Sequence, residues 1–99
     1  MSREAASSAA TIARVIGQSR RPAVVLYVAR GCHLCERARA TLDELGHELQ
    51  FELSEVDVTG DPVLEEHYRE WLPVVEINGK REFVYFVDPA AFARRLART

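Results

Sequence analysis

The chain has 99 residues, of which 47% are hydrophobic and 28% charged, with a net charge of -2 at pH 7. This length holds one domain, and the composition is that of a folded globular protein rather than a disordered one. The sequence has no basic stripe of the kind that nucleic-acid-binding proteins carry. No apolar run approaches the roughly 20 residues of a membrane span. We therefore expect a cytoplasmic monomer without nucleic-acid or membrane partners.

The first 21 residues are rich in alanine and serine and lack the continuous apolar core of a signal peptide. Ile12, Val15 and Ile16 are spaced as on one helix face, so a short helix and a disordered extension are both compatible with this segment. Pro22 ends it. We divide the chain into an N-terminal extension, 1–21, and one domain, 22–99.

The first half of the domain predicts a strand, a helix and a strand. Residues 23–29 are almost wholly apolar, which indicates a central strand buried on both faces. Apolar residues then recur every three or four positions from Cys35, which predicts an amphipathic helix ending near Gly46. Residues 51–58 form the second strand, although its alternation slips between Leu53 and Val56. Either a bulge or a late strand start would explain the slip.

The second half predicts a helix, a hairpin and a last helix. Asp61-Pro62 and Asp88-Pro89 each pair an N-cap residue with proline at the first helical position. Pro73 breaks the first of these helices. Asn78-Gly79 is a strong hairpin signal between strands at 74–77 and 82–87. With a right-handed crossover at its start, the order β-α-β-α-β-β-α predicts a four-stranded mixed sheet with helices on both faces. We place three aromatic residues in the core: Tyr68, Trp71 and Phe92.

The sequence Cys32-His33-Leu34-Cys35 lies where the first strand passes into the first helix. Free N–H groups and the positive end of the helix dipole meet there, and both stabilise a thiolate, the reactive form of cysteine. Cys35 heads the apolar stripe and should point inward. Cys32 lies at or near the N-cap and should be the exposed thiol of low pKa. In these roles Cys32 attacks a substrate disulfide and Cys35 resolves the mixed disulfide.

Two neighbours of the cysteines are candidate modulators. Arg30 adds positive potential two residues upstream, and His33 is placed to tune the redox poise of the pair. Asp57 is either a buried carboxylate that assists proton transfer or a surface residue at a strand end, and we favour the second interpretation.

Three other functions fit a CxxC pair. Structural zinc needs two further ligands, and His33, His47 and His67 are poorly placed to supply them. An iron–sulfur cluster or metal carrier would use Cys32 alone, whereas the internal Cys35 favours dithiol chemistry. A non-catalytic interaction module would keep the cysteines without using them. A redox pair at a strand-to-helix junction is the interpretation that we adopt, with no metal ligands assigned.

Three segments, 28–35, 56–58 and 72–75, together resemble the small bacterial glutaredoxin-like family of thioredoxin-fold thiol–disulfide oxidoreductases. The resemblance runs roughly from Ala23 to Leu96. It implies a thioredoxin-like fold and dithiol–disulfide oxidoreductase activity. It also implies that the peptide bond before Pro73 is cis, that the proline faces the active-site sulfurs, and that the Leu72 backbone is presented to the substrate.

The chain departs from true glutaredoxins at two segments, the second of which lets the backbone approach glutathione in those proteins. His33-Leu34 replaces Pro-Tyr between the cysteines, and Tyr85-Phe86-Val87-Asp88 replaces the Gly-Gly before the last helix. The bulk of Phe86 and Val87 predicts poor entry of glutathione, although Asp88 could still bind its amino group. We therefore expect no cofactor and only weak use of glutathione. The expected partners are protein or small-molecule disulfides and a thioredoxin-reductase-type or glutathione electron donor.

Overall fold

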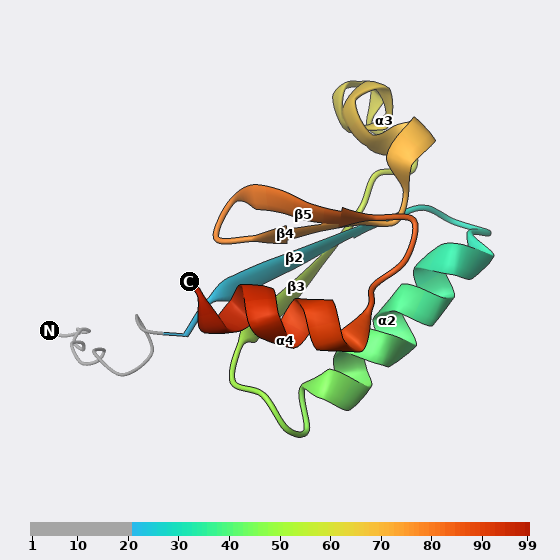
Figure 1. Cartoon of the computed structure of the whole chain (residues 1–99). Coiled ribbons are helices and arrows are strands. Elements are labelled where there is room, and N and C mark those ends of the chain that lie inside the picture. Colours follow the sequence, from blue (N-terminus) through green and yellow to red (C-terminus); the bar gives the residue numbers. More distant parts are fainter. Residues whose placement is uncertain (1–20) are drawn as a thin grey trace, which may run out of the picture.

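The computed structural model describes residues 21–99, so the predictions for the N-terminal extension lie outside the described residues except at Arg21. The elements follow the predicted order β-α-β-α-β-β-α (Figure 1). Among residues 21–99 we find no helix with the length and apolar character needed to cross a membrane. The elements are β2 (Ala23–Val28), α2 (His33–Leu45), β3 (Glu52–Asp57), α3 (Pro62–Tyr68), the 3₁₀ helix η2 (Arg69–Trp71), β4 (Val74–Ile77), β5 (Lys80–Val84) and α4 (Pro89–Ala97).

The strands form one mixed sheet in the order β3-β2-β4-β5, which makes β2 a central strand as predicted. β2 runs parallel to β3 and antiparallel to β4, and β4 pairs antiparallel with β5. Helices α2 and α4 lie along one side of the sheet, whereas α3 lies on the other side, beyond the ends of the strands (Figure 1). The fold is thioredoxin-like, with helices on both sides of the sheet.

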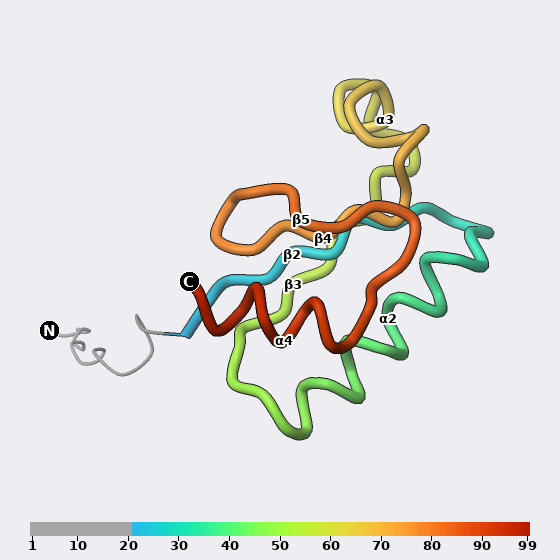
Figure 2. The backbone as a smooth tube through the Cα atoms, viewed as in Figure 1, coloured from blue at the N-terminus to red at the C-terminus, as the bar shows by residue number. Residues whose placement is uncertain are grey.

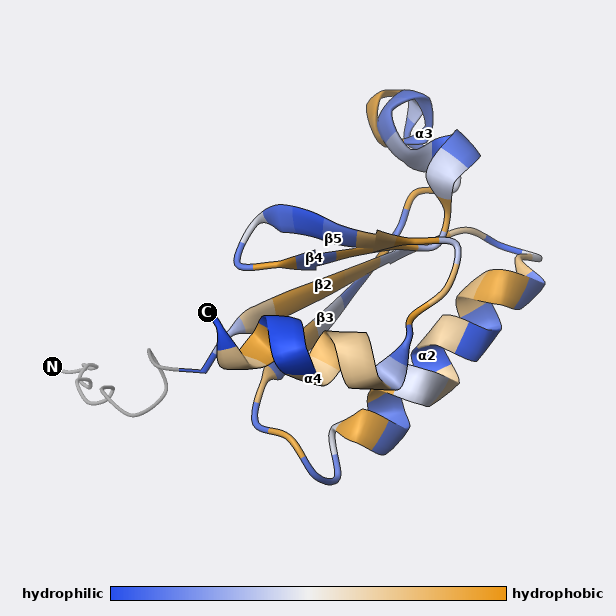
Figure 3. Cartoon of the chain, in the orientation of Figure 1, coloured by the Kyte–Doolittle hydropathy of each residue, from blue (hydrophilic) through white to orange (hydrophobic). Residues whose placement is uncertain are grey.

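The hydrophobic core lies between the sheet and the helices α2 and α4. β2 buries every second residue, Val24, Leu26 and Val28, and Figure 3 shows the apolar character of β2 and β4. The prediction that β2 is buried on both faces is wrong, because Val25 and Tyr27 on its second face are half-buried. The side chains that complete this core are Cys35, Ala38, Leu42, Val75, Ile77, Val87, Phe92 and Leu96.

Strand β3 begins at Glu52, one residue later than predicted, but Leu53 lies within it and is 38% exposed, so neither a late start nor a bulge accounts fully for the slip in the sequence pattern. It pairs with β2 in continuous register from Ala23–Glu52 to Val28–Asp57, without a bulge. Phe51 lies just before the strand, and its ring packs edge-on against Phe92 with centroids 5.2 Å apart.

The second hairpin strand differs from its predicted range of 82–87. β5 spans Lys80–Val84, because the tight Asn78-Gly79 turn, with both residues at positive φ, lets Lys80 pair directly with Ile77. The strand ends where Tyr85 adopts a φ of 72°.

The cap predictions at both Asp-Pro pairs are confirmed. Asp61 accepts hydrogen bonds from the backbone N–H groups of Val63 and Leu64, and Asp88 accepts one from Ala91. Phe92 is buried as predicted. The placement of Trp71 in the core is wrong, because α3 tightens into η2 and leaves this side chain 42% exposed.

A polar cluster on the second face of the sheet joins α3 to the strands. The hydroxyl groups of Tyr27 and Tyr68 each donate to the Glu76 carboxylate, at 3.3 and 3.1 Å. Their rings stack with centroids 4.1 Å apart, and Arg81 lies 5.7 Å from the centre of the Tyr68 ring. Tyr68 is therefore half-buried in this cluster rather than in the main core.

This cluster predicts a loss of stability in alkali. Three effects raise the pKa of Tyr68. The neighbouring Tyr27 hydroxyl has the largest effect, followed by burial and by the Glu76 carboxylate. Above about pH 10, the usual pKa of tyrosine, the unfolded chain loses the Tyr68 proton while the folded chain keeps it. Stability should therefore fall as the pH rises from that point. We expect Tyr68→Phe to reduce this slope in urea unfolding measured between pH 8 and 11.5, and an equally steep fall in the variant would contradict the assignment.

Candidate active site

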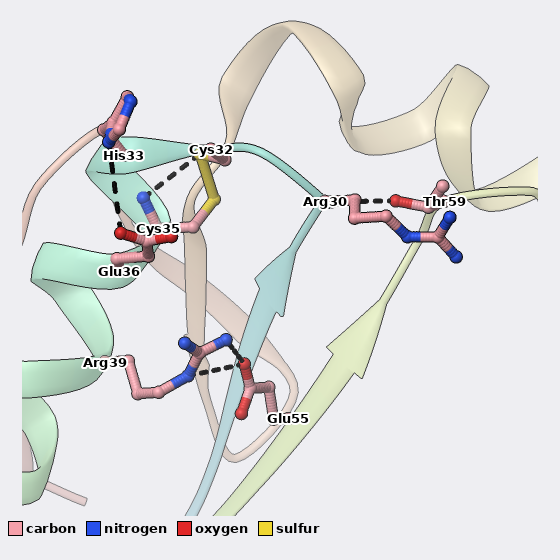
Figure 4. Close-up of a disulfide and its surroundings, with 8 residues drawn as sticks. All are labelled: Arg30, Cys32, His33, Cys35, Glu36, Arg39, Glu55 and Thr59. Atoms are coloured by element: carbon pink, nitrogen blue, oxygen red, sulfur yellow. Dashed lines mark hydrogen bonds and ion pairs between the residues drawn. A yellow bond between two sulfur atoms is a disulfide. The ribbon is translucent and has the colours of Figure 1, made fainter.

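The candidate site is a disulfide between Cys32 and Cys35 at the start of α2, with Cα atoms 5.2 Å apart (Figure 4). Cys32 is the N-cap residue, with extended backbone angles of -98° and 107°. The backbone N–H of Cys35 donates to the Cys32 sulfur at 3.1 Å. The sulfur therefore occupies the position where a serine or aspartate oxygen usually caps a helix.

The two sulfurs differ in exposure as the sequence predicts. Cys35 is 1% exposed and belongs to the core, whereas Cys32 is only partly buried at its edge. This difference arises because Cys35 lies on the inward face of the first helical turn, and Cys32 precedes the helix. Only Cys32 is open to a second sulfur from outside.

A cavity of about 370 Å³ opens beside Cys32. Its walls come from the loop between β2 and α2, the turn after β3, helix α3 and Leu72. Because β2 and β3 are parallel, the loops that follow them meet at the same end of the sheet. The backbone N–H of Arg30 joins the two loops by donating to the Thr59 hydroxyl at 2.9 Å.

Arg30 and Asp57 lie at this loop pair. Arg30 is exposed and lines the cavity with Cys32, although its guanidinium group points away from the disulfide (Figure 4). Asp57 is exposed at the end of β3, which confirms the surface interpretation. Hydrogen bonds from Thr59, and then the charge of Arg30, lower the pKa of Asp57 and keep it ionised. A permanently charged carboxylate of this kind is a poor proton acceptor for a thiol.

His33 points away from the disulfide into solvent (Figure 4). Its side chain is 95% exposed, and its Nδ1 atom lies 3.9 Å from the Glu36 carboxylate. His47 and His67 are also exposed. Within residues 21–99, no three His, Cys, Asp or Glu side chains gather in the manner of a metal site.

The Leu72–Pro73 peptide bond is cis, as the family resemblance implies. Leu72 has extended backbone angles of -66° and 143°, and it lines the same cavity as Cys32. Pro73 is buried next to it. An extended residue therefore lies beside the exposed sulfur.

The segment before α4 differs from the prediction at one residue. Val87 is 7% exposed and packs into the core, so its bulk does not face a ligand, whereas Phe86 is 68% exposed. The carboxylate of Asp88 is occupied as the helix cap, and Pro89 supplies no N–H at the first helical position.

Sequence reasoning missed several residues at this end of the molecule. Thr59, Glu65 and Arg69 line the cavity with Cys32, although no motif marks them. The backbone N–H of Gly60 donates to the Glu65 carboxylate at 3.0 Å, which fixes the turn after β3 against α3. These contacts depend on the tertiary arrangement of α3, which no local pattern encodes.

Known proteins resemble this chain over most of its length. The Glutaredoxin-like domain (DUF836) model matches residues 23–97. The uncharacterized proteins Rv0508 of Mycobacterium tuberculosis and Mb0520 of Mycobacterium bovis are each 34% identical over 84 residues, which are 80% of this chain and 87% of theirs. The solution structure of Ne2328 from Nitrosomonas europaea is 31% identical, with a TM-score of 0.67, over 77% of this chain and 92% of that one.

A more distant neighbour agrees in fold alone. Chloroplastic thioredoxin z is 20% identical, with a TM-score of 0.66, over 92% of this chain and 88% of its own. The family match, the relatives and the four-stranded fold around the Cys32–Cys35 pair agree with one another. The chain belongs to the Glutaredoxin-like domain (DUF836) family.

Proposed function

We propose that the protein is a dithiol–disulfide oxidoreductase in which Cys32 is the attacking thiolate and Cys35 the resolving thiol. The observation that carries this proposal is the N-cap position of Cys32. Its partly exposed sulfur accepts the Cys35 N–H and faces the positive end of α2, and both effects favour a thiolate.

The chemistry follows from the different exposure of the two sulfurs. In the reducing direction, the Cys32 thiolate attacks one sulfur of a substrate disulfide, and the other substrate sulfur leaves as a thiolate. Cys35 then loses its proton to the released substrate thiolate and attacks the Cys32 sulfur of the mixed disulfide. The Cys32–Cys35 disulfide forms, the second substrate thiolate leaves, and two electrons have passed to the substrate. A dithiol donor returns the pair to its reduced form.

The surroundings supply roles for the other candidate residues. Arg30 lines the cavity of Cys32 and adds positive potential to it, and the Leu72–Pro73 segment presents an extended backbone beside the sulfur. Substrates of this site are protein or small-molecule disulfides. The reaction suits the reducing cytoplasm, where a CxxC pair is more often catalytic than structural.

Trapping tests the proposed roles. In Cys35→Ser the resolving thiol is absent, so Cys32 should remain joined to its partner in a stable mixed disulfide. Mass spectrometry after incubation with a disulfide peptide should detect this adduct in nearly all of the protein. Cys32→Ser is the matched control and should form far less adduct, because its remaining sulfur is buried. Equal adduct in both variants would contradict the assignment of roles.

Labelling of the reduced protein gives an independent test. Cys32 should react with iodoacetamide faster than Cys35, by about tenfold or more, because it is exposed and stabilised as a thiolate. The pH profile of its labelling rate should have a midpoint below about 8.5, the value for free cysteine. Faster labelling of Cys35 would overturn the proposal.

A third test compares the rates at which two electron donors reduce the disulfide. We expect glutathione to reduce the Cys32–Cys35 disulfide slowly, and a thioredoxin-reductase-type donor to reduce it faster. Asp88 caps α4 with its own carboxylate, Pro89 removes an N–H, and Phe86 extends into solvent near the place where true glutaredoxins have glycine. The assay compares both donors at matched driving force. Efficient, saturable turnover with glutathione alone would contradict this expectation.

A further inference from the structure

An unusual turn ends strand β5. Tyr85 has a φ of 72°, and the backbone N–H of Phe86 donates to the Val84 carbonyl oxygen at 2.8 Å. This bond spans two residues and defines a γ-turn of the positive-φ type, which is rare and strained. Glycine adopts such a backbone freely, whereas a tyrosine does so at an energetic cost. The surrounding structure must therefore hold Tyr85 in place.

Three contacts fasten this turn to the segment that precedes β4. The Tyr85 hydroxyl donates to the Glu70 carbonyl oxygen at 3.1 Å, and its backbone N–H donates to the Pro73 carbonyl oxygen at 2.8 Å. The ring lies 6.3 Å from that of Trp71, at an angle of 37°. The strained residue is thus bound to both sides of Leu72, which shares the cavity of Cys32.

The turn also directs Phe86 outward. Phe86 is 68% exposed, whereas the next residue, Val87, is buried in the core. Trp71 and Tyr85 are 42% and 43% exposed. The rings of Trp71 and Tyr85 face each other and Phe86 follows Tyr85 in the chain, and we call these three exposed residues the aromatic surface. Neighbouring exposed aromatic side chains are more typical of a binding site than of a solvent-facing surface.

We propose that the aromatic surface binds an apolar side chain next to the reactive cysteine of a polypeptide substrate, an inference that rests on the proposed oxidoreductase function. The surface is continuous with the site, because Trp71 adjoins Leu72, and Leu72 lines the cavity of Cys32. Leu72 is extended, so a substrate strand can lie along it and reach both the sulfur and the aromatic side chains.

The chemistry of the surface favours this occupant over a small charged thiol. Its three side chains are aromatic, and the nearby Asp88 carboxylate is occupied by the Ala91 N–H at 2.9 Å. The cations that a small anionic ligand would use, Arg30 and Arg69, line the cavity of Cys32 and do not belong to the aromatic surface. An apolar side chain, in contrast, would remove area of Phe86 and Trp71 from water, which is favourable.

The test uses two synthetic peptides, each with one intramolecular disulfide, that differ only in having phenylalanine or glycine beside the attacked cysteine. Reduced protein is mixed with each peptide in a single turnover, quenched with acid and analysed by mass spectrometry. We expect the phenylalanine peptide to react about tenfold faster with the unaltered protein, a size of preference that apolar contacts can supply. In Phe86→Ser this ratio should fall to near one, and Phe86→Leu should restore most of it.

Val63→Ser is the matched control, because Val63 is also 68% exposed but lies on α3 outside the aromatic surface. It should keep the preference of the unaltered protein. Melting temperatures confirm that each variant is folded. If the unaltered protein reduces both peptides equally, or if Phe86→Ser keeps the preference, the aromatic surface has no such role while the oxidoreductase function stands. If it reduces neither peptide, both proposals are wrong.

Discussion

The arrangement of this end of the molecule, and the chemistry that we propose for it, depend on the hydrogen bond from the Cys35 amide to the Cys32 sulfur. A side-chain cap satisfies one of the free N–H groups at the start of a helix. In the proposed mechanism the capping atom is also the attacking atom. The same contact therefore begins α2, holds Cys32 outside the helix and leaves Cys35 on the buried face of its first turn.

The capped cysteine is held in position by the sheet. β2 is a central strand with a parallel neighbour on one side and an antiparallel neighbour on the other, and it leads through Arg30 and Gly31 to Cys32. The ion pair of Arg39 with Glu55 ties α2 to β3, as Figure 4 shows. Because parallel β2 and β3 end together, their loops enclose the cavity beside the exposed sulfur. An all-antiparallel arrangement would not bring these two loops to one end.

Local patterns in the sequence predict most of this fold. The apolar run of β2, the two Asp-Pro caps and the Asn78-Gly79 turn each carry their signal within a few residues, and the structure has each element where the pattern indicates. The CxxC at a strand-to-helix junction likewise predicts the disulfide and the unequal burial of its sulfurs. These features depend on backbone propensity and on periodic burial, both of which can be read from neighbouring residues.

The features that escaped prediction depend on contacts between distant segments. Trp71 is at a helical spacing that favours the core, yet a 3₁₀ turn and the Tyr85 ring place it at the surface. Tyr85 itself occupies a conformation that local preference disfavours, and only its bonds to residues 70 and 73 explain it. The clustering of Glu65 and Arg69 beside Cys32 follows from where α3 lies in three dimensions.

The course of the chain has a practical consequence for how the protein can be attached to something else. β2 begins, and α4 ends, at the end of the sheet opposite the disulfide, as the tube in Figure 2 shows. Pro22 and Thr99 line the same shallow hollow there, and Asn78 exchanges two hydrogen bonds with Ala23 beside it. A solid support or carrier attached near Pro22 or Thr99 would therefore contact the end of the domain that lies away from Cys32. Immobilised in this way, the domain presents the Cys32 sulfur to solution.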